Sequence, residues 1–129
     1  MSKVNDLTLT IQLLKPPSLN AYYSGGHWTK RKKAKDLFLA NVTSYFDEHD
    51  AFNAKQFEIH LTFNGRYDCD NAIIAVKFLA DSITALGIVK DDSKKYFQKL
   101  SIRVDDNLPN DTYIARVDFK DVEYGKYLS

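Results

Sequence analysis

The sequence predicts an α+β domain in which a mostly antiparallel four-stranded sheet carries helices on one face. Four segments alternate apolar and polar residues, as half-buried strands do, and two segments repeat apolar residues at helical spacing. Their order along the chain is β-α-β-α-β-β, which is typical of a two-layer arrangement. With 129 residues the chain can bury a core of its own, so we expect residues 1–129 to form a single domain.

The first half of the chain is expected to supply two strands and a helix between them. Leu7–Leu13 alternates without interruption and is followed by a proline pair, which cannot donate to a sheet. Phe57–Phe63 alternates in the same way. Thr29 is expected to cap a helix that runs to about Glu48. The apolar stripe of this helix is predicted to be Ala34, Leu37, Phe38, Val42 and Tyr45.

The second half is expected to supply a helix from Ala72 to Leu86, closed by Gly87, and two further strands. The stripe that anchors this helix is Ala72, Val76, Leu79, Ile83 and Leu86. Residues 88–90 are predicted to be a short extended piece. One strand covers 100–104, from a start near residue 96, and the last covers 113–119, with a hairpin-like turn over 105–112.

Composition and charge exclude several classes of protein. No apolar run reaches the roughly 18 residues that span a bilayer, and the N-terminus lacks a signal-peptide pattern, so we expect a cytoplasmic protein. The single cysteine cannot form an internal disulfide. The net charge is only +1, but residues 1–40 carry seven Lys or Arg and two Asp, whereas residues 104–129 carry three Lys or Arg and six Asp or Glu. This segregation is compatible with a polyanionic partner.

An acidic stretch surrounds the second helix. Asp68 and Asp70 stand at alternate positions beside Asn71, and Asp91 and Asp92 follow the helix. Carboxylates placed together need a cation, and oxygen ligands of this kind suit Mg²⁺ or Mn²⁺. Lys77 is predicted to share the helix face of Asp70, about 10 Å along the axis at 1.5 Å per residue.

Simpler interpretations of these residues remain open from the sequence. In the first interpretation, Asp70 or Asn71 is only a helix cap. In the second, Asp91-Asp92 is only a solvated turn. In the third, Lys77 only forms a surface pair with Asp81. The three histidines have no metal-ligand spacing, and His60 is most simply a residue on the polar face of a strand. The sequence has no phosphate-binding glycine loop and no EF-hand.

A basic and aromatic segment precedes and opens the first helix. Its candidates for contact with a nucleic-acid backbone and bases are Lys30, Arg31, Lys32, Lys33, Lys35, Tyr22, Tyr23 and Trp28. A solvated helix face is an equally weighted interpretation of the cations, and loop aromatics often pack onto a core or a partner.

These motifs together resemble the RusA family of crossover junction endodeoxyribonucleases. The matching residues, in order, are Pro16-Pro17-Ser18-Leu19-Asn20-Ala21-Tyr22-Tyr23, Asp68-Cys69-Asp70-Asn71, Lys77, Asp81 and Gly87-Ile88-Val89-Lys90-Asp91-Asp92. The resemblance implies a homodimeric, Mg²⁺-dependent nuclease, often carried by phages and prophages, that nicks four-way DNA junctions symmetrically. It implies Asp68, Asp70 and Asp92 as metal ligands, with Asp91 as the less favoured third ligand. Lys77 would be the catalytic lysine, and Asn71 would orient the aspartates or a phosphate.

The predicted reaction is phosphodiester hydrolysis by a metal-activated water in a Holliday junction, serving DNA recombination or repair. Two other classes remain as alternatives. One is a nucleic-acid-binding protein with a structural or vestigial metal site, and the other is a nuclease for flaps or other branched DNA.

Overall fold

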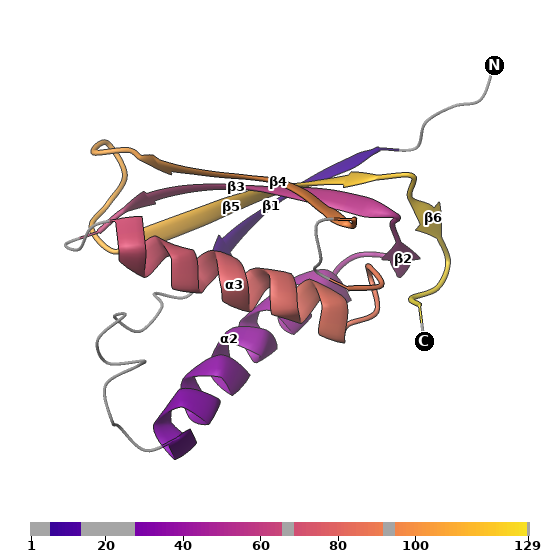
Figure 1. Cartoon of the computed structure of the whole chain (residues 1–129), viewed down its shortest axis with the longest axis horizontal. Coiled ribbons are helices and arrows are strands. Elements are labelled where there is room, and N and C mark those ends of the chain that lie inside the picture. The colour runs from indigo at the N-terminus through magenta and orange to yellow at the C-terminus, as the bar shows by residue number, and fades with distance from the viewer. Residues whose placement is uncertain (1–5, 14–27, 66–68, 92–94, 129) are drawn as a thin grey trace.

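A four-stranded mixed sheet with two helices on one face forms the body of the protein (Figure 1). The computed structural model describes residues 6–13, 28–65, 69–91 and 95–128, with only the backbone given at 28–31, 34 and 69–71. The predicted α+β class is confirmed. The elements are β1 (Leu7–Leu13), α2 (Trp28–Asp47), β2 (Phe52–Asn53), β3 (Gln56–Asn64), α3 (Cys69–Ala85), β4 (Phe97–Val104), β5 (Thr112–Lys120) and β6 (Glu123–Tyr124).

The strand order in the sheet is β1-β5-β3-β4. Strand β5 runs antiparallel to both β1 and β3, whereas β3 and β4 run parallel. Buried and more accessible residues alternate along β1, β3 and β5, because one face of each strand packs against the helices. No described helix covers the opposite face, which is polar (Figure 1).

Helix α3 provides the return connection that parallel strands require. It leaves the end of β3, runs back along the sheet and delivers the chain to the start of β4 (Figure 1). Gly87, at φ +79°, ends it as predicted. The Gly87 amide donates to the Thr84 carbonyl (3.0 Å) and the Ile88 amide to the Ile83 carbonyl (3.1 Å), which is a Schellman cap.

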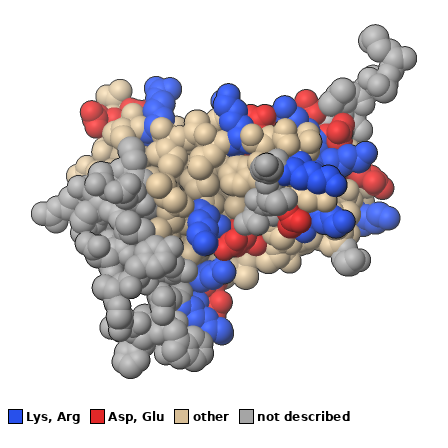
Figure 2. Space-filling view, in the orientation of Figure 1, with Lys and Arg blue, Asp and Glu red and all other residues tan. Residues whose placement is uncertain are grey.

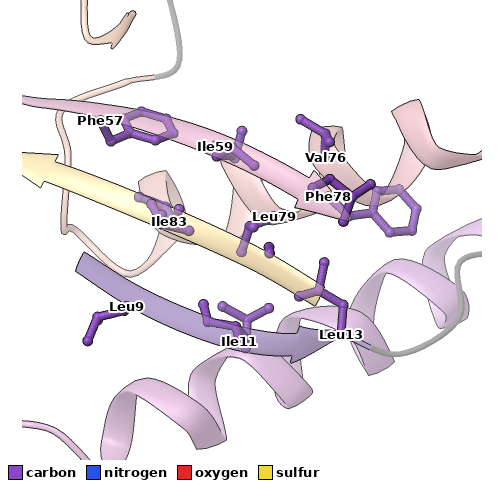
Figure 3. Packing of buried hydrophobic residues seen from close by; sticks show 14 of the residues in the cluster. Leu9, Ile11, Leu13, Phe57, Ile59, Val76, Phe78, Leu79 and Ile83 are labelled. Atoms are coloured by element: carbon purple, nitrogen blue, oxygen red, sulfur yellow. The ribbon is translucent and has the colours of Figure 1, made fainter. Parts of the chain in front are cut away.

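The core lies between the sheet and the two helices. Figure 3 shows side chains of β1 and β3 facing Val76, Leu79 and Ile83 of α3. The predicted stripe of α3 is confirmed, since Ala72, Val76, Leu79 and Ile83 are buried and Leu86 packs against the core. Neither helix in the described part of the chain is long and apolar enough to cross a membrane.

Helix α2 differs in detail from the prediction. It begins one residue earlier, at Trp28, so Thr29 lies inside its first turn rather than capping it. Phe38 and Val42 are buried as expected, but Leu37 is 56% exposed, and Phe46 completes the buried row instead. Residues 38, 42 and 46 follow strict i, i+4 spacing, which directs a narrow ridge to the core.

Two connections were also predicted incorrectly. The segment 105–111 is not a hairpin, because β3 lies between β4 and β5 in the sheet. It passes over the end of β3, where the Asp105 amide donates to the Phe63 carbonyl (2.9 Å) and Asn64 Nδ2 to the Leu108 carbonyl (2.6 Å). Residues 88–90 form bends rather than an extended piece, and Ile88 accepts a hydrogen bond from the Ala54 amide (2.8 Å).

The C-terminal segment docks on the end of α3. The pairing of β6 with β2, which the sequence did not indicate, brings it to that end of the molecule. The Leu128 amide donates to the Gly87 carbonyl (2.6 Å), and Asn53 Nδ2 donates to the Lys126 carbonyl (3.0 Å). The last residues therefore cover the turn that closes α3.

Replacing Gly87 with alanine is expected to destabilise the protein for two reasons. The left-handed backbone costs about 1–2 kcal/mol for a residue with a Cβ, and a Cβ at this position would collide with the Leu128 carbonyl oxygen. Gly125→Ala is the comparison, because Gly125 also has positive φ but open space around it. Urea unfolding should show a larger loss for Gly87→Ala. Equal losses of unfolding free energy for the two variants would mean that the C-terminal segment does not pack closely against this turn.

Candidate functional site

The acidic motif lies at the start of α3. Cys69 is the first residue of the helix, and Asp70 and Asn71 follow in its first turn. Free backbone N–H groups in this turn favour a negative charge nearby. Asp68 and Asp92 and the side chains of Asp70 and Asn71 lie outside the described part, so their predicted convergence on a metal stays a prediction.

Lys77 occupies the exposed face of α3, two turns after Asp70. It forms no ion pair with any described acid. Asp81, its expected surface partner, instead binds Lys35 of α2, with 3.3 Å between Lys35 Nζ and Asp81 Oδ2. The simple i,i+4 interpretation of Lys77 and Asp81 is therefore wrong, and Lys77 is exposed on the helix surface.

The first turns of α2 carry the basic cluster. Figure 2 shows basic side chains gathered over this helix, at the lower end of the view. Lys32, Lys33 and Lys35 are exposed, Lys32 Nζ lies 3.4 Å from Asp36 Oδ2, and both ends of that pair are solvated. Tyr22 and Tyr23 and the side chains of Trp28, Lys30 and Arg31 fall outside the described part. The described lysines thus form an accessible cationic surface.

Asp91 follows the C-terminal end of α3, whereas the acidic motif lies at its N-terminal end. The helix spans 17 residues, which at 1.5 Å per residue is about 25 Å. Lys90, the neighbour of Asp91, lines a cavity of about 530 Å³ together with Gln56 and Tyr96, which stand at the starts of β3 and β4. Within one chain, Asp91 is therefore remote from the turn that contains Asp70.

A cluster of side chains of metal-ligand type occupies the uncovered face of the sheet. Glu58 and His60 project from β3, and Asp118 projects from β5 directly opposite Glu58. His60 Nε2 lies 3.3 Å from Glu58 Oε1 and 3.5 Å from Asp118 Oδ2. The three side chains are 17%, 17% and 27% exposed, in the order Glu58, His60, Asp118. Their nitrogen and oxygen atoms, all within 4.8 Å of one another, form a group that could hold a metal ion.

Sequence reasoning treated His60 only as a polar-face residue. The alternation in β3 places Glu58 and His60 on the same face, so this part of the cluster was predictable from the sequence. Asp118 is brought in by the pairing of β3 with β5, which periodicity alone cannot supply.

Neighbouring cationic side chains keep Glu58 in its ionised form. A hydrogen bond from Lys120, whose Nζ lies 3.1 Å from Glu58 Oε2, lowers the pKa of Glu58 below its ordinary value, and His60 adds a smaller effect in the same direction. The same bond raises the pKa of Lys120. Glu58 is thus a carboxylate throughout the neutral range.

The replacement Glu58→Gln is expected to destabilise the protein in a pH-dependent way. A depressed native pKa contributes stability above the ordinary value of 4.5, and the contribution disappears as the pH falls through the native pKa. The difference in unfolding free energy between wild type and Glu58→Gln should therefore be largest near neutral pH and shrink below pH 4.5. Denaturant unfolding at several pH values measures it. Glu123→Gln, at an exposed position, is the control, and a difference for Glu58→Gln independent of pH would contradict the assignment.

No family model and no curated protein matches this sequence. Among solved structures, the chain is similar to a 2C-methyl-D-erythritol-2,4-cyclodiphosphate synthase, with 11% identity and a TM-score of 0.37, over 91% of this chain and 98% of that one.

Proposed function

We propose that this protein is a metal-dependent endodeoxyribonuclease that resolves four-way DNA junctions by paired symmetric nicks. The proposal rests on the RusA-like motifs of the sequence together with the places of Asp70 and Lys77 along α3. Its substrate is branched DNA in the cytoplasm, and its reaction is phosphodiester hydrolysis.

One observation supports the proposal most directly. Helix α3 starts inside the acidic motif, and its exposed face carries Lys77 without an ion-pair partner among the described residues. Because Asp81 is bound to Lys35, a surface pair with Asp81 does not explain Lys77. Lys77 is well suited to stabilise negative charge that develops on a phosphate during its transfer to water.

The donor set suits Mg²⁺, with Mn²⁺ as the substitute. Asp68 and Asp70 would hold the ion through carboxylate oxygens, which hard divalent cations prefer. When bound, the ion would supply an activated water and neutralise charge on the phosphate. Asn71 would orient the carboxylates, and Lys77 would contact the reacting phosphate.

The length of α3 bears on the third carboxylate. Because Asp91 follows the far end of this helix, we propose that a second copy of the chain supplies the third carboxylate, which the resemblance assigns to Asp92, to the start of α3. Ile73 near the start of α3 and Val104 at the end of β4 are each 50% exposed. These apolar side chains lie at the end of the molecule where a partner would approach. A homodimer built in this way contains two composite sites, as symmetric nicking requires.

The basic surface of α2 would hold the DNA arms. Lys32, Lys33 and Lys35 are exposed near the crossing of α2 and α3, and Lys35 connects the two helices through Asp81. Phosphate contacts of this kind give affinity without sequence preference and weaken with added salt.

Cleavage of a synthetic four-way junction in Mg²⁺ tests the function. Asp70→Asn is expected to abolish cleavage while junction binding persists or strengthens. Lys77→Ala should slow cleavage by about 10²- to 10³-fold, with little change in the Mg²⁺ concentration required. Lys126→Ala, an exposed lysine on the C-terminal segment, is the control and should cleave normally. Cleavage of flaps in preference to junctions would reassign the substrate, and wild-type binding without cleavage would indicate a binding protein.

Mixing two inactive variants tests the composite site. Asp70→Asn and Asp92→Asn are each expected to be inactive as homodimers. In a heterodimer of the two, one composite site carries both substitutions and the other is intact. Co-expressed, differently tagged chains should therefore regain nicking of one strand but not paired cleavage. A purified heterodimer without any nicking would show that each site is built within one chain.

A further inference from the structure

We propose that Glu58, His60 and Asp118 form a second metal site, specific for Zn²⁺ and related transition-metal ions, on the uncovered face of the sheet. The site is separate from the acidic motif of α3 and does not depend on the proposed nuclease activity.

The spacing of the ligand atoms fits a tetrahedral ion. Two atoms bound to Zn²⁺ at about 2.0–2.1 Å with a tetrahedral angle between them lie about 3.3–3.4 Å apart. His60 Nε2 lies 3.3 Å from Glu58 Oε1 and 3.5 Å from Asp118 Oδ2. The two carboxylate oxygens lie within 4.8 Å of each other, so a single ion can bridge the nitrogen to both oxygens once the side chains rotate to bring these oxygens to tetrahedral spacing.

The same distances are long for a histidinium ion pair. Charge-assisted N–H···O bonds are about 2.7–2.9 Å long, and one Nε2 proton shared between two carboxylates forms only a long, three-centre hydrogen bond. His60 Nδ1, in contrast, lies 2.7 Å from Ser101 Oγ. With Nδ1–H donating to Ser101, the Nε2 lone pair faces two carboxylate oxygens, and a cation between these three atoms would stabilise the arrangement.

Each ligand is held from behind by a neighbouring strand. Ser101 of β4 holds His60. Lys120 Nζ lies 3.1 Å from Glu58 Oε2, and Thr8 Oγ1 donates to Asp118 Oδ1 (2.9 Å). Arg116 Nε is 3.6 Å from that same Oδ1. These partners contact the outer atoms of the ligands and leave Oε1, Nε2 and Oδ2 directed at one another, as the supporting partners of metal ligands do.

The donor set decides the class of ion. One imidazole nitrogen with two carboxylate oxygens favours Zn²⁺ and other transition metals over Mg²⁺, which prefers oxygen ligands and retains its waters. Three protein ligands on a face that no described helix covers leave a fourth position for water. The ion would cross-link the two central strands of the sheet, β3 and β5.

Calorimetric titration of the chelator-treated protein with ZnCl₂, in excess Mg²⁺, tests the site. We expect one Zn²⁺ per chain. His60→Gln should lower the affinity at least 100-fold, and Ser101→Ala about 10- to 100-fold. Substituted Co²⁺ should give the visible absorption of a tetrahedral complex.

Two controls separate this site from the rest of the chain. His49→Gln, at an exposed histidine that follows the end of α2, should bind Zn²⁺ normally, as should Asp70→Asn, whether or not the nuclease proposal holds. Absence of Zn²⁺ binding by wild type would overturn the site and leave a histidine–carboxylate ion pair. Binding that survives His60→Gln would also overturn it.

A loss of binding has to be distinguished from a loss of folding. Circular dichroism of the metal-free His60→Gln variant therefore accompanies the titration and should show an intact sheet. Asp118→Asn removes a second ligand from a different strand and should weaken Zn²⁺ binding in the same way. A folded Asp118→Asn variant with wild-type affinity would contradict the three-ligand site.

Discussion

The parallel pairing of β3 with β4 constrains the rest of this molecule. Parallel neighbours cannot be joined by a tight turn, so the chain must return along the whole length of the sheet. Helix α3 makes this return and buries its apolar stripe against β1 and β3 on the way. Its two ends therefore lie at opposite ends of the domain, with the acidic motif at one end and Asp91 at the other.

The sheet separates two kinds of chemistry. On the helical side, packing uses large apolar residues, and the exposed surfaces of α2 and α3 carry lysines. On the other side, four adjacent strands place Thr8, Asp118, Glu58, His60 and Ser101 in one row of hydrogen bonds and ion pairs. Glu58, His60 and Asp118 lie on the central strands β3 and β5, where the backbone is paired on both sides, so their geometry is well defined.

The spacing of apolar residues predicted most of the helices and long strands correctly. It could not predict which strands pair with one another in the sheet. Alternation located β1, β3 and β5, and helical spacing located α3 and its glycine cap, because these features depend on neighbouring residues alone. The order of strands in the sheet depends on which segments meet, and for this reason residues 105–111 were mistaken for a hairpin and Asp118 was not associated with His60. The exposure of Leu37 and the burial of Phe46 were missed for the same reason. The face of α2 that is buried depends on how the helix packs on the rest of the fold, and the sequence of the helix alone does not specify this packing. The role proposed for Lys77 rests on its spacing from Asp70 and on the resemblance, and the structure adds that Asp81 is bound to Lys35.

The docking of Leu128 on Gly87 makes the end of α3 depend on a distant part of the chain. The Leu128 amide donates to the Gly87 carbonyl at the turn that closes α3, and β6 pairs with β2 a few residues before Leu128. If the segment that follows β6 separated from the body of the protein, this turn would lose a hydrogen-bond donor and become accessible to solvent. Hydrogen exchange at the Leu128 amide would therefore report on how tightly the end of α3 is held.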